Sequence, residues 1–131
     1  MMKLKDQIVS GISDTVVKTI LQNKHITNNI GFHNLLQHNL SLLSRKYGFT
    51  YDKEYPVANR GDGRIGFIDV AWFDNSSLKA VIEIDSRLRK KSFFKLKSTD
   101  ATYKIWVCYS NDTIIPADKM PDDIIVIHHQ R

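Results

Sequence analysis

The sequence predicts a single α/β domain whose elements follow the order α-α-β-β-β-α-β-β. Apolar residues recur at helical spacing up to residue 47. Beyond that point, short apolar runs rich in β-branched and aromatic residues alternate with Gly, Pro, Asn and Asp clusters, as in strands joined by turns. A length of 131 residues suits one domain, which we expect to span residues 1–131.

Two helices are expected before the strands. The first, near residues 3–22, has an apolar face that repeats every four residues, at Leu4, Ile8, Ile12, Val16 and Ile20. Gly11 weakens this helix, because glycine is unfavourable in a helix interior. After a polar break at residues 23–29, a second helix carries an apolar stripe that runs from Phe32 to Tyr47, and Gly48 ends it.

Five strands and one further helix follow. The strands are expected at residues 49–57, 65–73, 78–85, 103–109 and 124–127. The first is an edge strand, because Pro56 cannot donate to a ladder. A hairpin turn at residues 74–77 joins the second strand to the third, and residues 87–97 predict a short basic helix after the third.

Composition narrows the class of protein. Lys and Arg number 19 against 14 Asp and Glu, and the net charge of +5 favours a polyanionic partner. Cys108 is the only cysteine, which excludes an internal disulfide and a zinc site with several cysteines. Neither a signal peptide nor an apolar run long enough to span a membrane is recognisable. We therefore expect a cytoplasmic protein that does not contact a membrane.

Three carboxylates interrupt strands that are otherwise apolar. Asp69 lies in the second strand, and Glu83 and Asp85 lie in the third. Side chains alternate along a strand, so Glu83 and Asp85 share one face, and the hairpin makes Asp69 a near neighbour of Glu83. Unpaired carboxylates in such a place are costly, so a positive group is expected between them.

Two kinds of positive group meet this expectation. Mg²⁺ prefers oxygen ligands and keeps several waters, so Asp69, Glu83 and the backbone carbonyl of Ile84 would suffice to hold it. Alternatively, the carboxylates pair with a basic side chain, for which Lys104 and Arg64 are candidates. The spacing alone favours neither.

A basic segment follows the acids directly. It contains Arg87, Arg89, Lys90, Lys91, Lys95 and Lys97. Lys91 and Lys95 are four residues apart and share a helix face. Together with Arg60 and Arg64, which flank a turn, these cations are candidate contacts for nucleic-acid phosphates. A solvated basic helix is the alternative interpretation.

The spacing of the histidines does not predict a metal site, and the tryptophans are expected to be structural. His25, His33 and His38 lack the spacing of a helical metal pair. Trp72 and Trp106 lie on predicted strands and are expected in the core.

The order of these elements and residues resembles the PD-(D/E)XK nuclease superfamily, over roughly residues 35–127. The resemblance implies a restriction-endonuclease-like fold, in which helices flank a central mixed sheet of about five strands. It also implies that Asp69 and Glu83 bind Mg²⁺, for which Mn²⁺ can substitute.

The sequence departs from the superfamily pattern at two points. Asp85 stands where the pattern has a lysine, so the motif reads Glu-x-Asp. Some members supply the lysine from the following helix, which makes Lys91 the first candidate here. Arg87 is the second, because it would face the same way as Glu83 and Asp85 if the strand continued. Many members also carry a glutamate on the helix before the sheet, and here Gln37 or His38 is the candidate for orienting a water at that place.

The resemblance implies a metal-dependent endonuclease that hydrolyses phosphodiester bonds of DNA, duplex or branched. Asp85 would hold a second metal or act as the base, and Lys91 or Arg87 would stabilise the developing charge. Residues 1–25 are not required by the superfamily core, and they either pack over the sheet or mediate a homodimer. A non-catalytic nucleic-acid-binding module on the same fold is the alternative function, and a protein–protein adaptor is a third.

Overall fold

The computed structural model describes residues 2–87, 89–109 and 123–131, and its elements follow the predicted order. The helices are α1 (Leu4–Gln22), α2 (Asn29–Leu43), the 3-10 helix η1 (Ser44–Tyr47) and α3 (Lys90–Lys97), and the strands are β1 (Thr50–Val57), β2 (Gly66–Asp74), β3 (Ser77–Asp85), β4 (Tyr103–Cys108) and β5 (Ile124–His128). The order α-α-β-β-β-α-β-β is confirmed for the described residues. The predicted basic helix begins later than expected, at Lys90 rather than Arg87.

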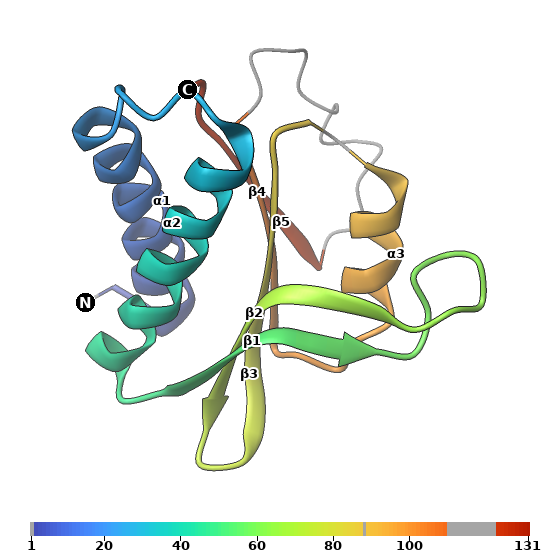
Figure 1. Cartoon of the computed structure of the whole chain (residues 1–131). Coiled ribbons are helices and arrows are strands. Elements are labelled where there is room, and N and C mark those ends of the chain that lie inside the picture. Colours follow the sequence, from blue (N-terminus) through green and yellow to red (C-terminus); the bar gives the residue numbers. More distant parts are fainter. Residues whose placement is uncertain (1, 88, 110–122) are drawn as a thin grey trace.

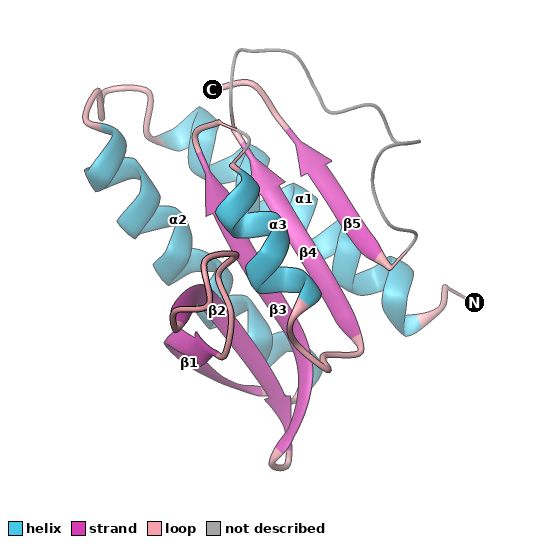
Figure 2. Cartoon of the chain, turned by 90° about the vertical axis from the view of Figure 1, so that its right-hand side faces the viewer, coloured by secondary structure: helices cyan, strands magenta, loops and turns pink. Residues whose placement is uncertain are grey.

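The five described strands form one mixed sheet in the order β1-β2-β3-β4-β5. β2 pairs antiparallel with both β1 and β3, whereas β4 pairs parallel with both β3 and β5. Parallel neighbours need a crossover connection, and α3 lies in the one between β3 and β4. Helices α1 and α2 cover one face of the sheet and α3 covers the other (Figure 1, Figure 2). The arrangement therefore has three layers.

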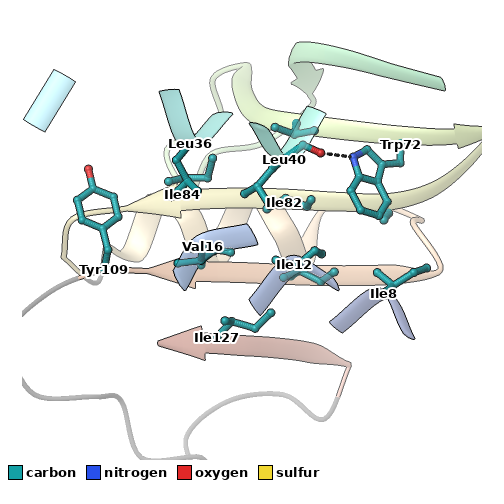
Figure 3. Close-up of a cluster of buried hydrophobic side chains, with 14 of the residues drawn as sticks. Ile8, Ile12, Val16, Leu36, Leu40, Trp72, Ile82, Ile84, Tyr109 and Ile127 are labelled. Atoms are coloured by element: carbon teal, nitrogen blue, oxygen red, sulfur yellow. Dashed lines mark hydrogen bonds between the residues drawn. The ribbon is translucent and has the colours of Figure 1, made fainter. Parts of the chain in front are cut away.

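The larger core lies between the sheet and helices α1 and α2. Ile8, Ile12 and Val16 of α1 have no exposed surface, so the apolar stripe predicted for this helix is buried. Trp72 of β2 belongs to the same cluster, where its indole N–H donates to the carbonyl of Leu40 at 3.2 Å (Figure 3). The first helix therefore packs over the sheet, which is the first of the two roles expected for it.

A smaller core lies on the other face, under α3. It includes Ile68, Val81, Trp106 and Leu96, the last of which comes from α3 itself. Because both faces of β3 are covered, this strand is buried on both sides, as its apolar sequence predicts. Within the described residues, no helix combines the length and the apolar character that a bilayer span requires.

A glycine in the interior of α1 allows close packing against Tyr47. The Tyr47 ring lies 6.2 Å from the ring of Phe49 and 5.8 Å from that of Trp72, centroid to centroid, and its hydroxyl donates to the carbonyl of Gln7. A Cβ added at Gly11 would come 2.0 Å from the Tyr47 hydroxyl oxygen. Because the ring is held on several sides, it has little room to retreat.

We expect Gly11→Ala to destabilise the protein, although the same change stabilises an ordinary helix by about 1 kcal/mol. Overpacking against Tyr47 should outweigh that gain and leave a net loss of about 1–2 kcal/mol, measurable by urea unfolding. Tyr47→Phe removes the clashing oxygen, so Gly11→Ala should destabilise the Tyr47→Phe variant less than it destabilises the wild type. If Gly11→Ala stabilised the wild-type protein, this contact would not explain the glycine.

Candidate active site

β2 and β3 separate from each other at one end of their ladder. Their pairing ends at Val70 and Ile82. Beyond these residues, positions 66–68 of β2 pair with β1, and positions 83–85 of β3 pair with β4. Figure 1 shows the two strands diverging. In the gap that the separation leaves in the sheet, hydrogen bonds from side chains replace part of the ladder.

The three predicted acids line one pocket at this gap. The pocket has a volume of about 250 Å³ and is bounded by Asp69, Glu83 and Asp85 together with Asn29, Ile30, His33, Ile84, Ser86, Arg89, Lys95 and Tyr109. The structure thus brings together the three carboxylates that the sequence predicted to be neighbours on two adjacent strands. It also adds side chains from α2 and α3 that the strand pattern could not supply.

Asp69 stands at the point of separation, and both of its backbone groups bond to side chains. Its N–H donates to Oε1 of Glu83 at 3.0 Å, and its carbonyl accepts a hydrogen bond from Nε2 of Gln37 at 2.9 Å. Ile68 lies in the core under α3, whereas Val70 lies in the core under α1 and α2. Residues two apart on a regular strand share a face, so β2 is bent at Asp69.

The Asp69 carboxylate bridges the separated strands. Its Oδ2 accepts a hydrogen bond from the backbone N–H of Ile84 at 2.7 Å, and its Oδ1 lies 3.2 Å from Nε2 of His33 on α2. The hydrogen bond to Asp69 raises the pKa of His33. His33 is a site residue that the sequence did not reveal, because only the packing of α2 against β2 shows its acidic partner.

Gln37 supports the bend in β2. Its buried side-chain amide donates to the carbonyl of Asp69 and also to Oε1 of Glu54, at 2.9 Å in each case. Glu54 has a φ of +55°, a left-handed conformation that residues other than glycine rarely adopt. His38, the other helix candidate for orienting a water, contacts Nζ of Lys53 at 3.3 Å. Neither Gln37 nor His38 lines the pocket.

Glu83 is the most deeply buried of the three acids, with only 1% of its surface exposed. Its Oε2 forms an ion pair with Nζ of Lys95 at 2.8 Å. Burial and the negative charge of Asp69 raise the pKa of Glu83 to about 8, although Lys95 opposes this shift. The Lys95 amine also donates to the carbonyl of Phe67 at 2.9 Å, so it is held between β3 and β2.

Asp85 is anchored by α3 and β4. Its Oδ2 accepts hydrogen bonds from the hydroxyl of Ser92 and from the indole N–H of Trp106, the latter at 2.7 Å. Burial raises the pKa of Asp85, and these two hydrogen bonds oppose the shift. Nε of Arg89 lies 3.9 Å from Oδ1, and an ion pair at this distance with a half-exposed arginine contributes little. Asp85 is therefore held by hydrogen bonds rather than by a close cation.

The structure places Lys95 against the acids, rather than the preferred candidates Lys91 and Arg87. β3 ends at Asp85, so Arg87 does not continue the strand face of Glu83, and it is exposed. Lys91 lies in the first turn of α3 and is also exposed. One turn later, only 17% of the Lys95 side chain is exposed. The shared helix face of Lys91 and Lys95 was the useful signal, but the packing of α3 decides which lysine reaches the acids.

The other basic side chains predicted to contact phosphates are either exposed or paired with an acid. The exposed ones are Arg64, Arg89, Lys90, Lys91 and Lys97. Arg60 forms an ion pair with Asp62 at 2.9 Å, which compensates part of its charge. Lys104, one candidate partner of the acids, instead pairs with Asp123 at 3.2 Å. The basic partner of Glu83 is therefore neither of the two side chains that the sequence suggested.

The pocket supplies only the smallest set of carboxylate ligands that a hard divalent cation can use. Within the described residues, no group of three His, Cys, Asp or Glu side chains is placed to hold a metal ion. Mg²⁺ can be held by one or two carboxylates, because waters complete its shell. Asp69 and Glu83 meet across the gap, and each carboxylate oxygen keeps a second lone pair. A cation on these two groups is compatible with the pocket, and it would compete with Lys95 for Glu83.

Comparisons with other proteins do not assign the chain to a family. No protein-family model, curated protein or solved structure matches it. The restriction-endonuclease-like fold therefore stays a prediction. The coarser class, an α/β protein with three α-helices and a mixed five-stranded sheet, is established for the described residues.

The raised pKa values imply that the folded protein loses stability as the pH rises. A group whose pKa is higher in the folded protein than in the unfolded chain keeps its proton longer when folded, so folding is favoured most below the lower pKa. For Glu83 the window runs from 4.5, its ordinary pKa, to about 8. The pKa shifts of Asp85 and His33 have the same direction.

We expect the free energy of unfolding to decrease between about pH 5 and about pH 8, and Glu83→Gln to flatten this decrease. Urea unfolding at a series of pH values measures both. Asp100 is exposed and lies outside the pocket, so Asp100→Asn is the control and should keep the wild-type slope. An unchanged pH profile in Glu83→Gln would contradict the shift assigned to this carboxyl group.

Proposed function

We propose that this chain is a metal-dependent nuclease that hydrolyses phosphodiester bonds of DNA. The observation that carries the proposal is the convergence of Asp69, Glu83, Asp85 and Lys95 in one pocket beside a basic helix. The resemblance to PD-(D/E)XK nucleases implies the same combination of two acids on neighbouring strands with a nearby cation.

The charge balance of the pocket favours a bound cation. Among the described residues, the three carboxyl groups have one lysine and one histidine in close contact, and the pKa of Glu83 is raised by burial and by Asp69. A divalent cation next to Asp69 and Glu83 would favour the ionised form of both. When bound there, Mg²⁺ or Mn²⁺ supplies Lewis acidity toward a phosphate oxygen and lowers the pKa of a bound water.

Side chains of the pocket can perform the other tasks of hydrolysis. The amine of Lys95 can donate to a phosphate oxygen on which negative charge develops. His33 holds Oδ1 of Asp69 and thereby orients this carboxylate. Asp85, fixed by hydrogen bonds from α3 and β4, is the remaining acid and can accept a proton. Exposed cations on α3 can position the flanking phosphates.

The origin of the lysine supports this assignment. In the superfamily, some members supply it from the helix after the third strand. Lys95 comes from α3, which follows β3, while Asp85 occupies the usual lysine position on the strand. The variant motif expected from the sequence therefore has a physical counterpart in the Lys95–Glu83 ion pair.

A non-catalytic nucleic-acid-binding module is the second candidate function. The Lys95–Glu83 ion pair favours it, because a lysine that neutralises the buried acid makes a metal ion unnecessary. In that case the basic surface of α3 would bind phosphates and no bond would be broken. Cleavage assays and metal binding separate the two candidates.

Incubation of the protein with DNA and Mg²⁺ or Mn²⁺ should produce cleavage. Asp69→Ala and Glu83→Ala should each lower the rate on the order of 100-fold or more, and Lys95→Ala by a similar factor. Lys91→Ala removes an exposed lysine of the same helix, and as the matched comparison it should lower the rate much less than Lys95→Ala does. Cleavage that survives the loss of both acids would remove the assignment. A tight, salt-sensitive DNA complex without cleavage would favour the binding module.

Metal binding should be measurable without any substrate. Mn²⁺ or Mg²⁺ at about 100 times its Kd should stabilise the protein by about 2.7 kcal/mol, seen as a higher unfolding temperature. The effect should be larger at about pH 8 than at about pH 5.5, because protonation of Glu83 opposes binding. Asp69→Asn should abolish the effect, and Asp100→Asn should not. Equal stabilisation of both variants would locate the cation outside this pocket.

A further inference from the structure

Two large apolar side chains are exposed on elements that contribute to the pocket. Ile30, in the first turn of α2, lines it and is 73% exposed, and Phe67 of β2 is 50% exposed. The pocket is otherwise lined mainly by charged and polar side chains. Exposed apolar groups that border a polar cavity are typical of ligand-binding surfaces.

Phe67 faces away from the core under α3 because side chains alternate along β2. Ile68 points into the core under α3. Its neighbour Phe67 therefore faces the other side of the strand, and the carboxylate of Asp69, the other neighbour of Ile68, contacts His33 of α2. Phe67 precedes Asp69 by two residues, so their Cα atoms lie at most about 7 Å apart. In addition, the carbonyl of Phe67 accepts a hydrogen bond from the Lys95 amine, which lines the pocket.

The backbone that carries Phe67 is fixed by close packing. A Cβ added at the preceding Gly66 would come 2.8 Å from both Cδ of Lys95 and Cβ of Arg60. On the β1 side, Phe67 is in register with Pro56. The ring is therefore presented to solvent by a strand that is held on two sides, so little ordering is needed when a ligand stacks on it.

We propose that Ile30 and Phe67 form an apolar rim that receives an unpaired nucleobase, so that the substrate is single-stranded next to the scissile phosphate. This inference rests on the proposed function. A phenyl ring can stack on the face of any base. In a continuous duplex these faces are covered by neighbouring base pairs, and only an unpaired nucleotide offers one to the rim.

The charges around the rim favour a nucleic acid as its occupant. Arg89 and Lys95 line the same pocket, and Lys90, Lys91 and Lys97 are exposed on α3. An apolar protein surface laid over the rim would also desolvate such cations without compensating them. A single strand offers base faces to Ile30 and Phe67 and phosphates to the cations.

The test measures binding by fluorescence anisotropy in the presence of a chelator, so that cleavage does not intervene. The probes are a labelled single-stranded oligonucleotide, the blunt duplex of the same sequence, and that duplex with a single-stranded tail. The single strand and the tailed duplex should bind more tightly than the blunt duplex. Phe67→Ala should weaken binding of the single strand about 5- to 30-fold and leave the blunt duplex nearly unchanged.

Further variants separate stacking from general apolar contact and from misfolding. Phe67→Tyr keeps a ring and should retain wild-type affinity, whereas Phe67→Leu should behave like Phe67→Ala. Leu21→Ala removes another exposed apolar side chain, on α1, and should have no effect on binding. Unfolding temperatures of all variants verify that each is folded.

The inference would be overturned if Phe67→Ala bound the single strand as tightly as the wild type, or lost as much affinity for the blunt duplex as for the single strand. Full single-strand affinity in Phe67→Leu, or no binding of any nucleic acid by the wild type, would overturn it as well. Its failure and that of the proposed function are distinguishable. Ring-dependent single-strand binding without cleavage under Mg²⁺ or Mn²⁺ would sustain the rim and defeat the nuclease. Cleavage together with unaltered binding by Phe67→Ala would do the opposite.

Discussion

The separation of β2 from β3 is the constraint on which the site depends. Backbone groups that lose their ladder partners inside a protein must find others. Here the carboxylates of Glu83 and Asp69 accept from the N–H groups of Asp69 and Ile84, and the amide of Gln37 satisfies the carbonyl of Asp69. The acids therefore have a structural task as well as a proposed chemical one, and the pocket exists because side chains replace part of the ladder.

The same arrangement concentrates negative charge in a poorly solvated place. Lys95 compensates Glu83 directly, and His33 contacts Asp69. Among the described residues, the partners of the Asp85 carboxylate are neutral donors and a more distant arginine. Burial opposes ionisation of Glu83 and Asp85, and their pKa values are raised. A site of this kind lowers the stability of the folded chain at neutral pH. The same concentration of carboxyl groups is what the proposed function would use to bind a divalent cation.

The acids of the site could be predicted from the sequence, whereas their partners could not. A carboxylate that interrupts an apolar strand is conspicuous, and period-two alternation with a short hairpin turn places Asp69 near Glu83. Lys95 and His33 lie on helices, and helical periodicity shows which residues share a face but not how far that helix is shifted along the sheet. A shift of one turn changes which lysine reaches Glu83. For the same reason the sequence could not show that His33, rather than Gln37 or His38, reaches the carboxylate of Asp69.

The sequence by itself determined the order and approximate bounds of the helices and strands, because local periodicity, glycine and proline act over a few residues. It also determined that α1 is amphipathic, although not that its face would be buried in the main core. Only the tertiary structure decided where β2 and β3 part, why Gly11 lies under Tyr47, and that Phe67 is exposed beside Asp69. These features arise from packing between segments distant in the chain, and no local pattern encodes the relative placement of a sheet and the helices on its two faces.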